Sequence, residues 1–121
     1  MKKDLSKGLR PSKKDRKEIL FGTFEFRNGR NVSIRRGIKW AEAKGVYMGK
    51  PSDKKDRRNV VVEILFTEIY RFKDIPAKVL YYEHQKSCMT YEGLLAAMFD
   101  GYGSGFMEDE YVTAIYFHFK E

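Results

Sequence analysis

The chain has 121 residues and a mass of 14.3 kDa, which is room for one compact domain, and a hydrophobic content of 42% can fill a single core. Its apolar runs are too short to cross a bilayer, no apolar segment follows the Lys-rich start, and the lone Cys88 has no partner for an internal disulfide. We therefore expect a cytoplasmic protein without a secretory signal or membrane association.

Positive charge is concentrated in the first half of the chain. The net charge of +7 divides into +5 over residues 1–18, +7 over residues 19–58 and −5 over residues 59–121. A one-sided positive surface favours a polyanionic partner such as nucleic acid, although a Lys-rich surface can also serve only solubility. Residues 1–18 lack an apolar stripe, so we expect a flexible basic arm followed by one domain over residues 19–121.

The first predicted elements are strands. Residues 19–27 fit a strand of mixed exposure, and Asn28-Gly29 predicts a two-residue hairpin leading into a second strand over residues 31–35. The three glycines of residues 37–49 predict a loop that enters a short strand near residues 46–48. Residues 51–58 then read as a charged, exposed turn.

The strongest strand signal covers residues 60–72, a β-branched and aromatic run long enough to bend or change partner midway. Pro76 is expected to open a helix that reaches about Gln85, because its missing N–H costs nothing in a first turn. Thr90 is a suitable cap for a second helix, which the glycine-rich residues 101–105 would end.

The two alternating sets of side chains in residues 111–119 predict a closing strand that is buried on at least one face. Strands and helices do not alternate regularly along the chain, which argues against a parallel sheet. The sequence therefore predicts an α+β fold, a small, partly closed mixed β-barrel with two short helices packed at one side.

Four segments of the chain form a recognisable series. They are Gly29–Arg35, then Val62–Ile64 with Ile69, Phe72 and Asp74-Ile75, then Cys88–Leu95, and finally Val112–Phe117. In their order and spacing these segments resemble the ASCH domain, a small β-barrel related to PUA domains, and in particular the small bacterial ASCH proteins that hydrolyse N4-acetylcytidine. The resemblance covers roughly residues 19–119 and implies a cleft beside the barrel that accommodates RNA or a nucleoside.

The resemblance allows two motif registers. In the first register, which we prefer, Ser33 falls where the hydrolases place a Thr and Arg35 falls on the family's strand Arg. The catalytic Lys of the family then falls near Asn31 and its catalytic Glu near Ser87, with Glu83 as a displaced carboxylate. In the second register residues 37–44 match the signature Gly-x-Lys-x-x-Glu-x-Arg, apart from Lys in the last place, and Lys39 and Glu42 become the cleft residues.

The nucleic-acid contacts are expected around the predicted hairpin and the loop after it. Forked guanidinium groups can hold phosphates, and aromatic side chains between basic residues can stack bases. A solvated hairpin and a Trp that only packs are the alternatives. The candidate contacts are Arg27, Arg30, Arg35, Arg36, Lys39, Trp40 and Tyr47.

We therefore expect a monomeric nucleic-acid-binding module, with RNA favoured over DNA, that uses a basic hairpin and the cleft. The alternatives are a hydrolase of a modified nucleoside, an RNA-cleaving relative, or an accessory protein of a ribonucleoprotein. The catalytic candidates for an enzyme are Ser33, Lys39, Glu42 and Glu83. We expect no cofactor, and His84 and His118 lack the spacing of a metal site.

Overall fold

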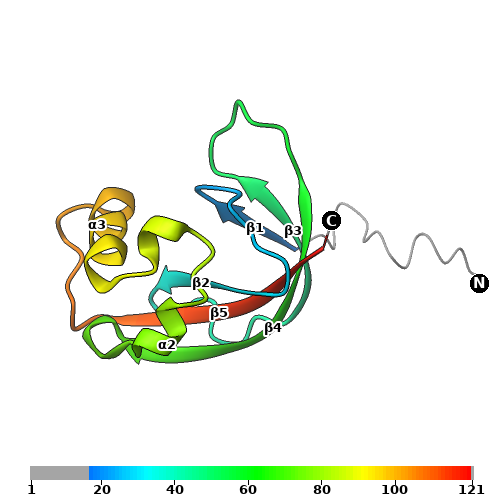
Figure 1. The fold of residues 1–121 in the computed structure, drawn as a ribbon. Helices are drawn as coiled ribbons and strands as arrows, with labels where there is room; N and C mark the ends of the chain where they lie inside the picture. Colours follow the sequence, from blue (N-terminus) through cyan, green and yellow to red (C-terminus); the bar gives the residue numbers. More distant parts are fainter. Residues whose placement is uncertain (1–16, 121) are drawn as a thin grey trace, which may run out of the picture.

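The computed structural model describes residues 17–120, leaving the predicted arm, apart from Lys17 and Glu18, outside the described residues. The chain forms a five-stranded mixed sheet in the order β1-β3-β4-β5-β2 and two short helices, so the predicted α+β fold is confirmed (Figure 1). The strands are β1 (Glu18–Phe21), β2 (Arg30–Arg36), β3 (Gly45–Pro51), β4 (Val60–Arg71) and β5 (Tyr111–Lys120). The helices are α2 (Ala77–Leu80) and α3 (Tyr91–Tyr102), with the 3-10 turns η1 (Phe72–Asp74) and η2 (Lys86–Cys88).

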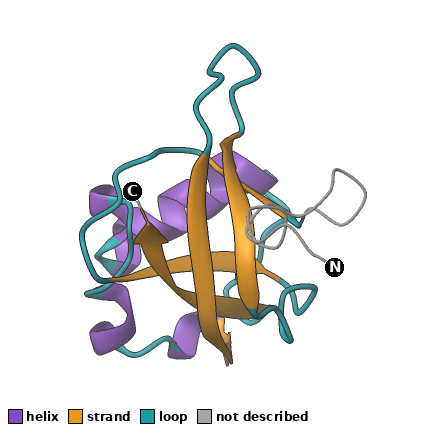
Figure 2. Ribbon diagram, turned by 90° about the vertical axis from the view of Figure 1, so that its right-hand side faces the viewer, coloured by secondary structure: helices purple, strands orange, loops and turns teal. Residues whose placement is uncertain are grey.

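The sheet is strongly curved, and its two end strands, β1 and β2, do not pair with each other. β1 runs parallel to β3, and every other neighbouring pair is antiparallel. The register shifts between Ile64 and Phe66, so β4 bends midway as its length predicts. Figure 2 shows the helices gathered beside the sheet and the β3–β4 connection projecting beyond it.

Each face of the sheet has its own core, because successive residues of a strand point to opposite sides. On β5, Val112, Ala114 and Tyr116 join the cluster under the helices. Ile115 and Phe117 join the other cluster, inside the curve of the sheet. Beside this second cluster, β3 requires a residue without a side chain at Gly49. A Cβ there would lie 2.8 Å from the Val60 side chain and 3.1 Å from the Phe21 ring.

The predicted Asn28-Gly29 hairpin is wrong. The chain does turn at Gly29, whose φ is +90°, but β1 pairs with β3 and β2 pairs with β5. β5 offers β2 a seven-residue antiparallel register, Arg30 to Arg36 against His118 to Val112, and this long-range pairing outweighs the local turn signal.

The first predicted helix is shorter than expected. Pro76 is its N-cap, and the helix ends at Leu80 rather than near Gln85. The backbone then extends because Val32 N–H donates to the Tyr82 carbonyl at 2.7 Å and His84 N–H donates to the Val32 carbonyl at 2.9 Å. This segment covers the outer edge of β2, which no local pattern signals. By contrast, the second helix begins as predicted, with the Thr90 hydroxyl accepting a bond from the Gly93 N–H.

Candidate functional site

The polar residues of β2 lie on the face of the strand opposite its apolar residues. Val32 and Ile34 join the core under the helices, so the alternating Asn31, Ser33 and Arg35 face the inside of the curved sheet. Asn31 is fully buried, and its side-chain amide forms hydrogen bonds with the backbone of Arg27. Asn31 therefore holds the turn before β2 in place, whereas Ser33 and Arg35 remain available to a cavity.

The segment that covers the edge of β2 adds two ionisable residues to the same place. Backbone pairing with Val32 sets Glu83 and His84 beside β2, although about fifty residues separate them along the chain. The Arg27 guanidinium fixes this segment by donating to the Tyr81 carbonyl at 3.0 Å and the Glu83 carbonyl at 2.7 Å. A long-range backbone contact thus brings two of the predicted catalytic candidates, Ser33 and Glu83, together.

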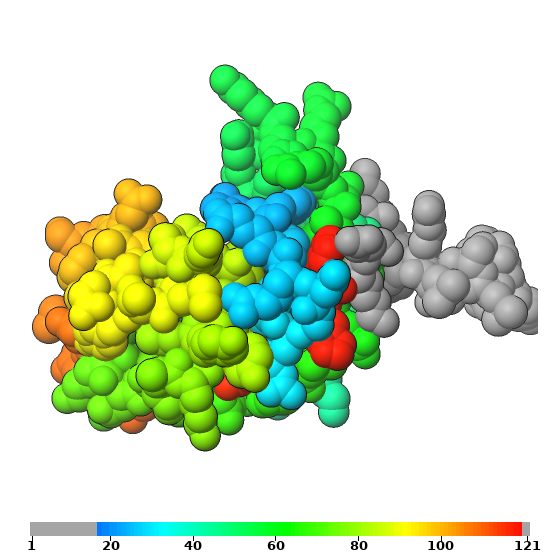
Figure 3. All heavy atoms as spheres, viewed as in Figure 1, coloured from blue at the N-terminus to red at the C-terminus, as the bar shows by residue number. Residues whose placement is uncertain are grey.

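We call the resulting space the gap cavity, because it lies where the sheet fails to close. Its volume is about 520 Å³, within the usual range for ligand sites. In the space-filling view, β1 (blue) and the yellow-green and yellow residues of η2 and α3 lie on the same face (Figure 3). Leu20, Ile34, Leu94, Ala97 and Met98 form its apolar lining. The polar lining includes Ser33, Arg35, Glu83, His84, Gln85 and Tyr102.

Arg35 is partly buried and has no carboxylate partner. Its Nε donates to the Ser33 hydroxyl at 2.9 Å, and its guanidinium lies 5.1 Å from the centroid of the Phe21 ring. None of the ion pairs among residues 17–120 includes Arg35. Burial lowers the pKa of Arg35 from its ordinary value, while Tyr102 and Glu83 act in the opposite direction. The site therefore holds a positive charge that is not neutralised by contact.

Glu83 is only 3% exposed, and burial raises the pKa of its carboxyl group to about 8. The backbone N–H of Gln85 donates to Glu83 Oε1 at 3.1 Å, and this bond and the charges of Arg35 and Arg27 lower the pKa, but burial outweighs them. Glu83 therefore holds a proton at neutral pH and can donate as well as accept a hydrogen bond.

His84 is the neutral neighbour of Glu83. Burial, reinforced by Arg35 and Arg27, lowers the pKa of His84 to about 3. Its imidazole packs against the rings of Phe21 and Phe26, with Nε2 at 3.5 Å from Glu83 Oε1. The buried Nδ1 has no hydrogen-bond partner among the described residues, and such an atom normally has one.

Cys88 also lines the gap cavity but is not an activated nucleophile. Burial, with the charge of Glu83, raises the pKa of its thiol to about 11. The group therefore stays a thiol at neutral pH. Cys88 is a free, buried cysteine that acts as a small packing side chain.

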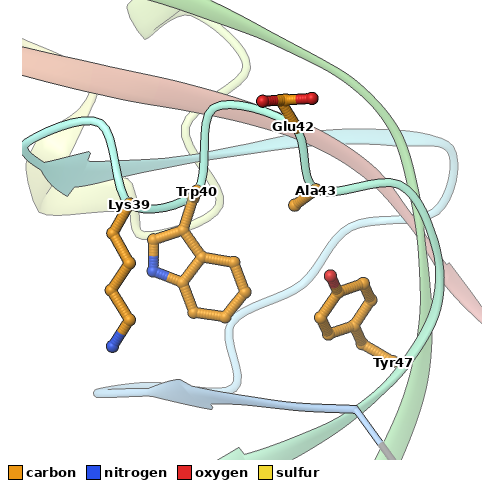
Figure 4. A pocket seen from close by; sticks show the side chains of 5 residues that line it. All are labelled: Lys39, Trp40, Glu42, Ala43 and Tyr47. Carbon is orange, nitrogen blue, oxygen red and sulfur yellow. The ribbon is translucent and has the colours of Figure 1, made fainter.

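A second, shallower space of about 290 Å³ lies on the loop after β2, and we call it the loop pocket. Lys39, Trp40, Glu42, Ala43 and Tyr47 line it (Figure 4). The Trp40 and Tyr47 rings lie with centroids 5.8 Å apart, while the Glu42 carboxylate points away from both rings. The loop pocket shares no lining residue with the gap cavity, so the two motif registers correspond to two separate places.

The remaining predicted nucleic-acid contacts have other neighbours. Arg36 donates to both carboxylate oxygens of Glu110, at 2.6 and 2.9 Å. Arg30 is exposed and lies over the Tyr82 and Tyr116 rings, on the side of the helix-covered core. The predicted Arg cluster is therefore dispersed, and of its four members only Arg35 lines either of the two spaces described, the gap cavity. The polar lining residues His84, Gln85 and Tyr102 were not predicted as site residues, and the adjacent ionisable pair Glu83-His84 was the available signal.

Residues 17–120 contain no group of three or more His, Cys, Asp or Glu side chains that could hold a metal ion. Neither helix in this part of the chain has the length and apolar character needed to span a membrane. No family model, curated protein or solved structure matches the chain.

Proposed function

We propose that this chain is a nucleic-acid-binding module with a partly closed, ASCH/PUA-like barrel, and that it binds single-stranded RNA through the gap cavity. The observation that carries the proposal is the cavity itself, with an uncompensated guanidinium and a hydroxyl on one wall and aliphatic side chains on the other. Apolar walls can receive the face of an unstacked base, and polar groups can bond to its edge or to the backbone.

The basic surface of residues 17–58 supports this proposal. Most of its positively charged side chains are exposed, and such charges attract a polyanion without selecting a sequence. The exposed ones are Lys17, Arg30, Lys39, Lys44, Lys54, Lys55, Arg57 and Arg58. We propose that this surface gathers the strand and that the gap cavity supplies the defined contact.

The test measures binding of fluorescently labelled single-stranded RNA, and of DNA of the same sequence, by anisotropy across a salt series. Arg35→Ala and Arg57→Ala each remove one positive charge, but Arg57 is exposed and lines neither space. We expect Arg35→Ala to cost roughly 1–3 kcal/mol of binding free energy and Arg57→Ala clearly less. Arg35→Lys, which keeps the charge but loses the fork, should recover only part of the loss. Equal losses from the two alanine variants would show that net charge alone attracts RNA.

A hydrolase of a modified nucleoside is the second candidate, because Ser33 and Glu83 line one cavity and the raised pKa of Glu83, about 8, suits a general acid. No lysine of the described residues lines that cavity, and the predicted catalytic pair Lys39 and Glu42 lies in the loop pocket instead. We therefore expect little or no deacetylation of N4-acetylcytidine. Rapid turnover that Glu83→Gln abolishes and Lys39→Ala leaves intact would favour the enzyme.

A further inference from the structure

Two guanidinium groups lie at or next to the gap cavity: Arg35 lines it, and Arg27, which does not, donates to the backbone carbonyl of the lining residue Glu83. Arg27 and Arg35 are both at least partly buried, and the hydrogen bonds from their side chains go to carbonyl groups, a hydroxyl and the Met89 thioether. Neither guanidinium forms an ion pair within the described residues. Withdrawing a charge from water without a counter-charge is unfavourable, so this arrangement favours an anionic ligand.

The one carboxyl group that lines the cavity does not supply that counter-charge at neutral pH. Glu83 is held in its protonated form by burial, despite its proximity to both guanidinium groups. His84 is neutral for the same reason and has an Nδ1 without a partner. The cavity therefore offers one forked cation, neutral polar groups and an apolar wall.

We infer that the gap cavity binds the phosphate monoester of a nucleotide, with the phosphate on the Arg35 guanidinium and the nucleoside against the apolar wall. This inference rests on the proposed function, and it adds that the ligand is anionic and ends in a phosphate monoester. The guanidinium fork matches phosphate oxygens in a two-point contact, and a monoester carries nearly two negative charges at neutral pH. Leu20, which is exposed, supplies surface for the base, and the other lining residues Leu94 and Met98 are buried in the core behind the cavity lining. The monoester belongs either to a free mononucleotide or to the phosphorylated end of an RNA strand.

Glu83 makes this binding depend on pH. The groups around its carboxyl are Arg35 from β2, Arg27 from the turn before β2, and the neighbouring His84. The charge of Glu83 also raises the pKa of Cys88 from η2, as does the charge of the exposed Glu25. Tyr102 from α3 acts on Arg35. When Glu83 ionises, near pH 8, its charge competes with the phosphate for Arg35. Affinity for the monoester therefore falls between pH 7 and 9.5, a range in which the phosphate remains dianionic because its second pKa is about 6.

Titration calorimetry at pH 7 with the four 5′-mononucleotides, the 3′-mononucleotides, the matching nucleosides and inorganic phosphate tests the ligand class. We expect at least one mononucleotide to bind ten times or more tightly than both its nucleoside and inorganic phosphate. Arg35→Ala should remove that difference, and Arg57→Ala should leave it intact. RNA oligonucleotides with a 5′-phosphate, a 3′-phosphate or two hydroxyl ends then show whether the ligand is the phosphorylated end of a strand or a free nucleotide.

Glu83→Gln tests the charge state. It keeps the size and hydrogen-bonding capacity of the side chain but cannot ionise, so we expect the affinity of this variant to be the same at pH 7 and at pH 9.5. A tenfold gain at pH 7 would show that Glu83 is already ionised and would overturn the inference. Nucleosides that bind as tightly as nucleotides would also overturn it. If oligonucleotides bind equally whatever their ends and Arg35→Ala weakens them all, the inference fails and the proposed function stands. If only free mononucleotides bind, the proposed function fails and the phosphate site stands.

Discussion

The gap cavity and the loop pocket contain similar residue types in opposite surroundings. In the gap cavity, burial raises the pKa of Glu83 and lowers that of His84, and Arg35 has no ion-pair partner among residues 17–120. In the loop pocket Lys39 and Glu42 are exposed, and water solvates both charges. The comparison teaches that depth rather than residue type distinguishes the two places, because desolvation makes a charge responsive to a ligand.

The largest expected effect, and the strongest test of this comparison, is the dependence of the free energy of unfolding on pH. The pKa of Glu83 is about 8 in the folded chain against an ordinary value of 4.5, so the folded state binds a proton more tightly than the unfolded state. The contribution of Glu83 to the free energy of unfolding is fully present below about pH 4.5 and is lost as the pH rises through 8. By linkage the loss is roughly 3–5 kcal/mol.

His84 has the opposite sign. Its pKa is about 3 in the folded chain against 6.5, so the stability it supports is present above about pH 6.5 and is lost as pH falls towards 3. The two contributions oppose each other between about pH 4.5 and 6.5, where we expect the maximum free energy of unfolding. Denaturant titrations from pH 3 to 9 measure the profile. Glu83→Gln should flatten its alkaline side, whereas Glu42→Gln should leave both sides unchanged. If the stability of Glu83→Gln fell at high pH as much as that of the unaltered protein, the Glu83 carboxyl would be solvated like that of Glu42.

The next effect concerns the wall of the gap cavity. A Cβ on Gly93, at the start of α3, would lie 1.8 Å from the backbone carbonyl oxygen of Ser87. Backbone cannot move aside as a flexible side chain can, so we expect Gly93→Ala to cost about 1–3 kcal/mol or more of folding free energy. Thermal unfolding measures it.

Gly101→Ala is the matched control, because it lies on the same helix and its Cβ would meet nothing within 4 Å. An exposed helical Gly→Ala change should stabilise by roughly 0.5–1 kcal/mol. Variants of equal stability would contradict the close approach of η2 and α3 that walls the cavity.

The sequence predicts the elements whose signals are local. The length of β4, the closing strand β5 and the Thr90 cap of α3 each come from neighbouring residues, and each is confirmed. The pairing of β1 with β3 and the extended segment beside β2 depend on contacts between distant residues, which no turn motif or periodicity encodes. Local signals even misled at Asn28-Gly29 and beyond Leu80, where long-range backbone pairing prevailed.

The candidate site follows the same rule. Lys39 and Glu42 stand three residues apart, so the sequence presents them as a motif, yet they line only the loop pocket. Ser33 and Glu83 were each recognisable as candidates, but their meeting depends on the pairing of Val32 with the segment around Glu83. The pKa of Glu83 could not be predicted either, since it depends on burial that only the folded chain creates.

The smallest expected effect sharpens the comparison from the side of the loop pocket. Trp40 is partly buried beside Tyr47 and packs against the core inside the sheet, so it offers at most one ring face to a base. Trp40→Ala should weaken RNA binding by about 1 kcal/mol, the lower end for a stacked base, and by the same amount at every salt concentration, because stacking releases no counterions. Lys39→Ala, its neighbour in the pocket, should instead give a loss that shrinks as salt rises. The measurement is the anisotropy salt series, read alongside the melting temperature of each variant, since the packing of Trp40 also contributes to stability. A Trp40→Ala protein that melts lower but binds RNA unchanged would assign the ring to packing alone, and the gap cavity would then be the only one of the two places that contacts the strand.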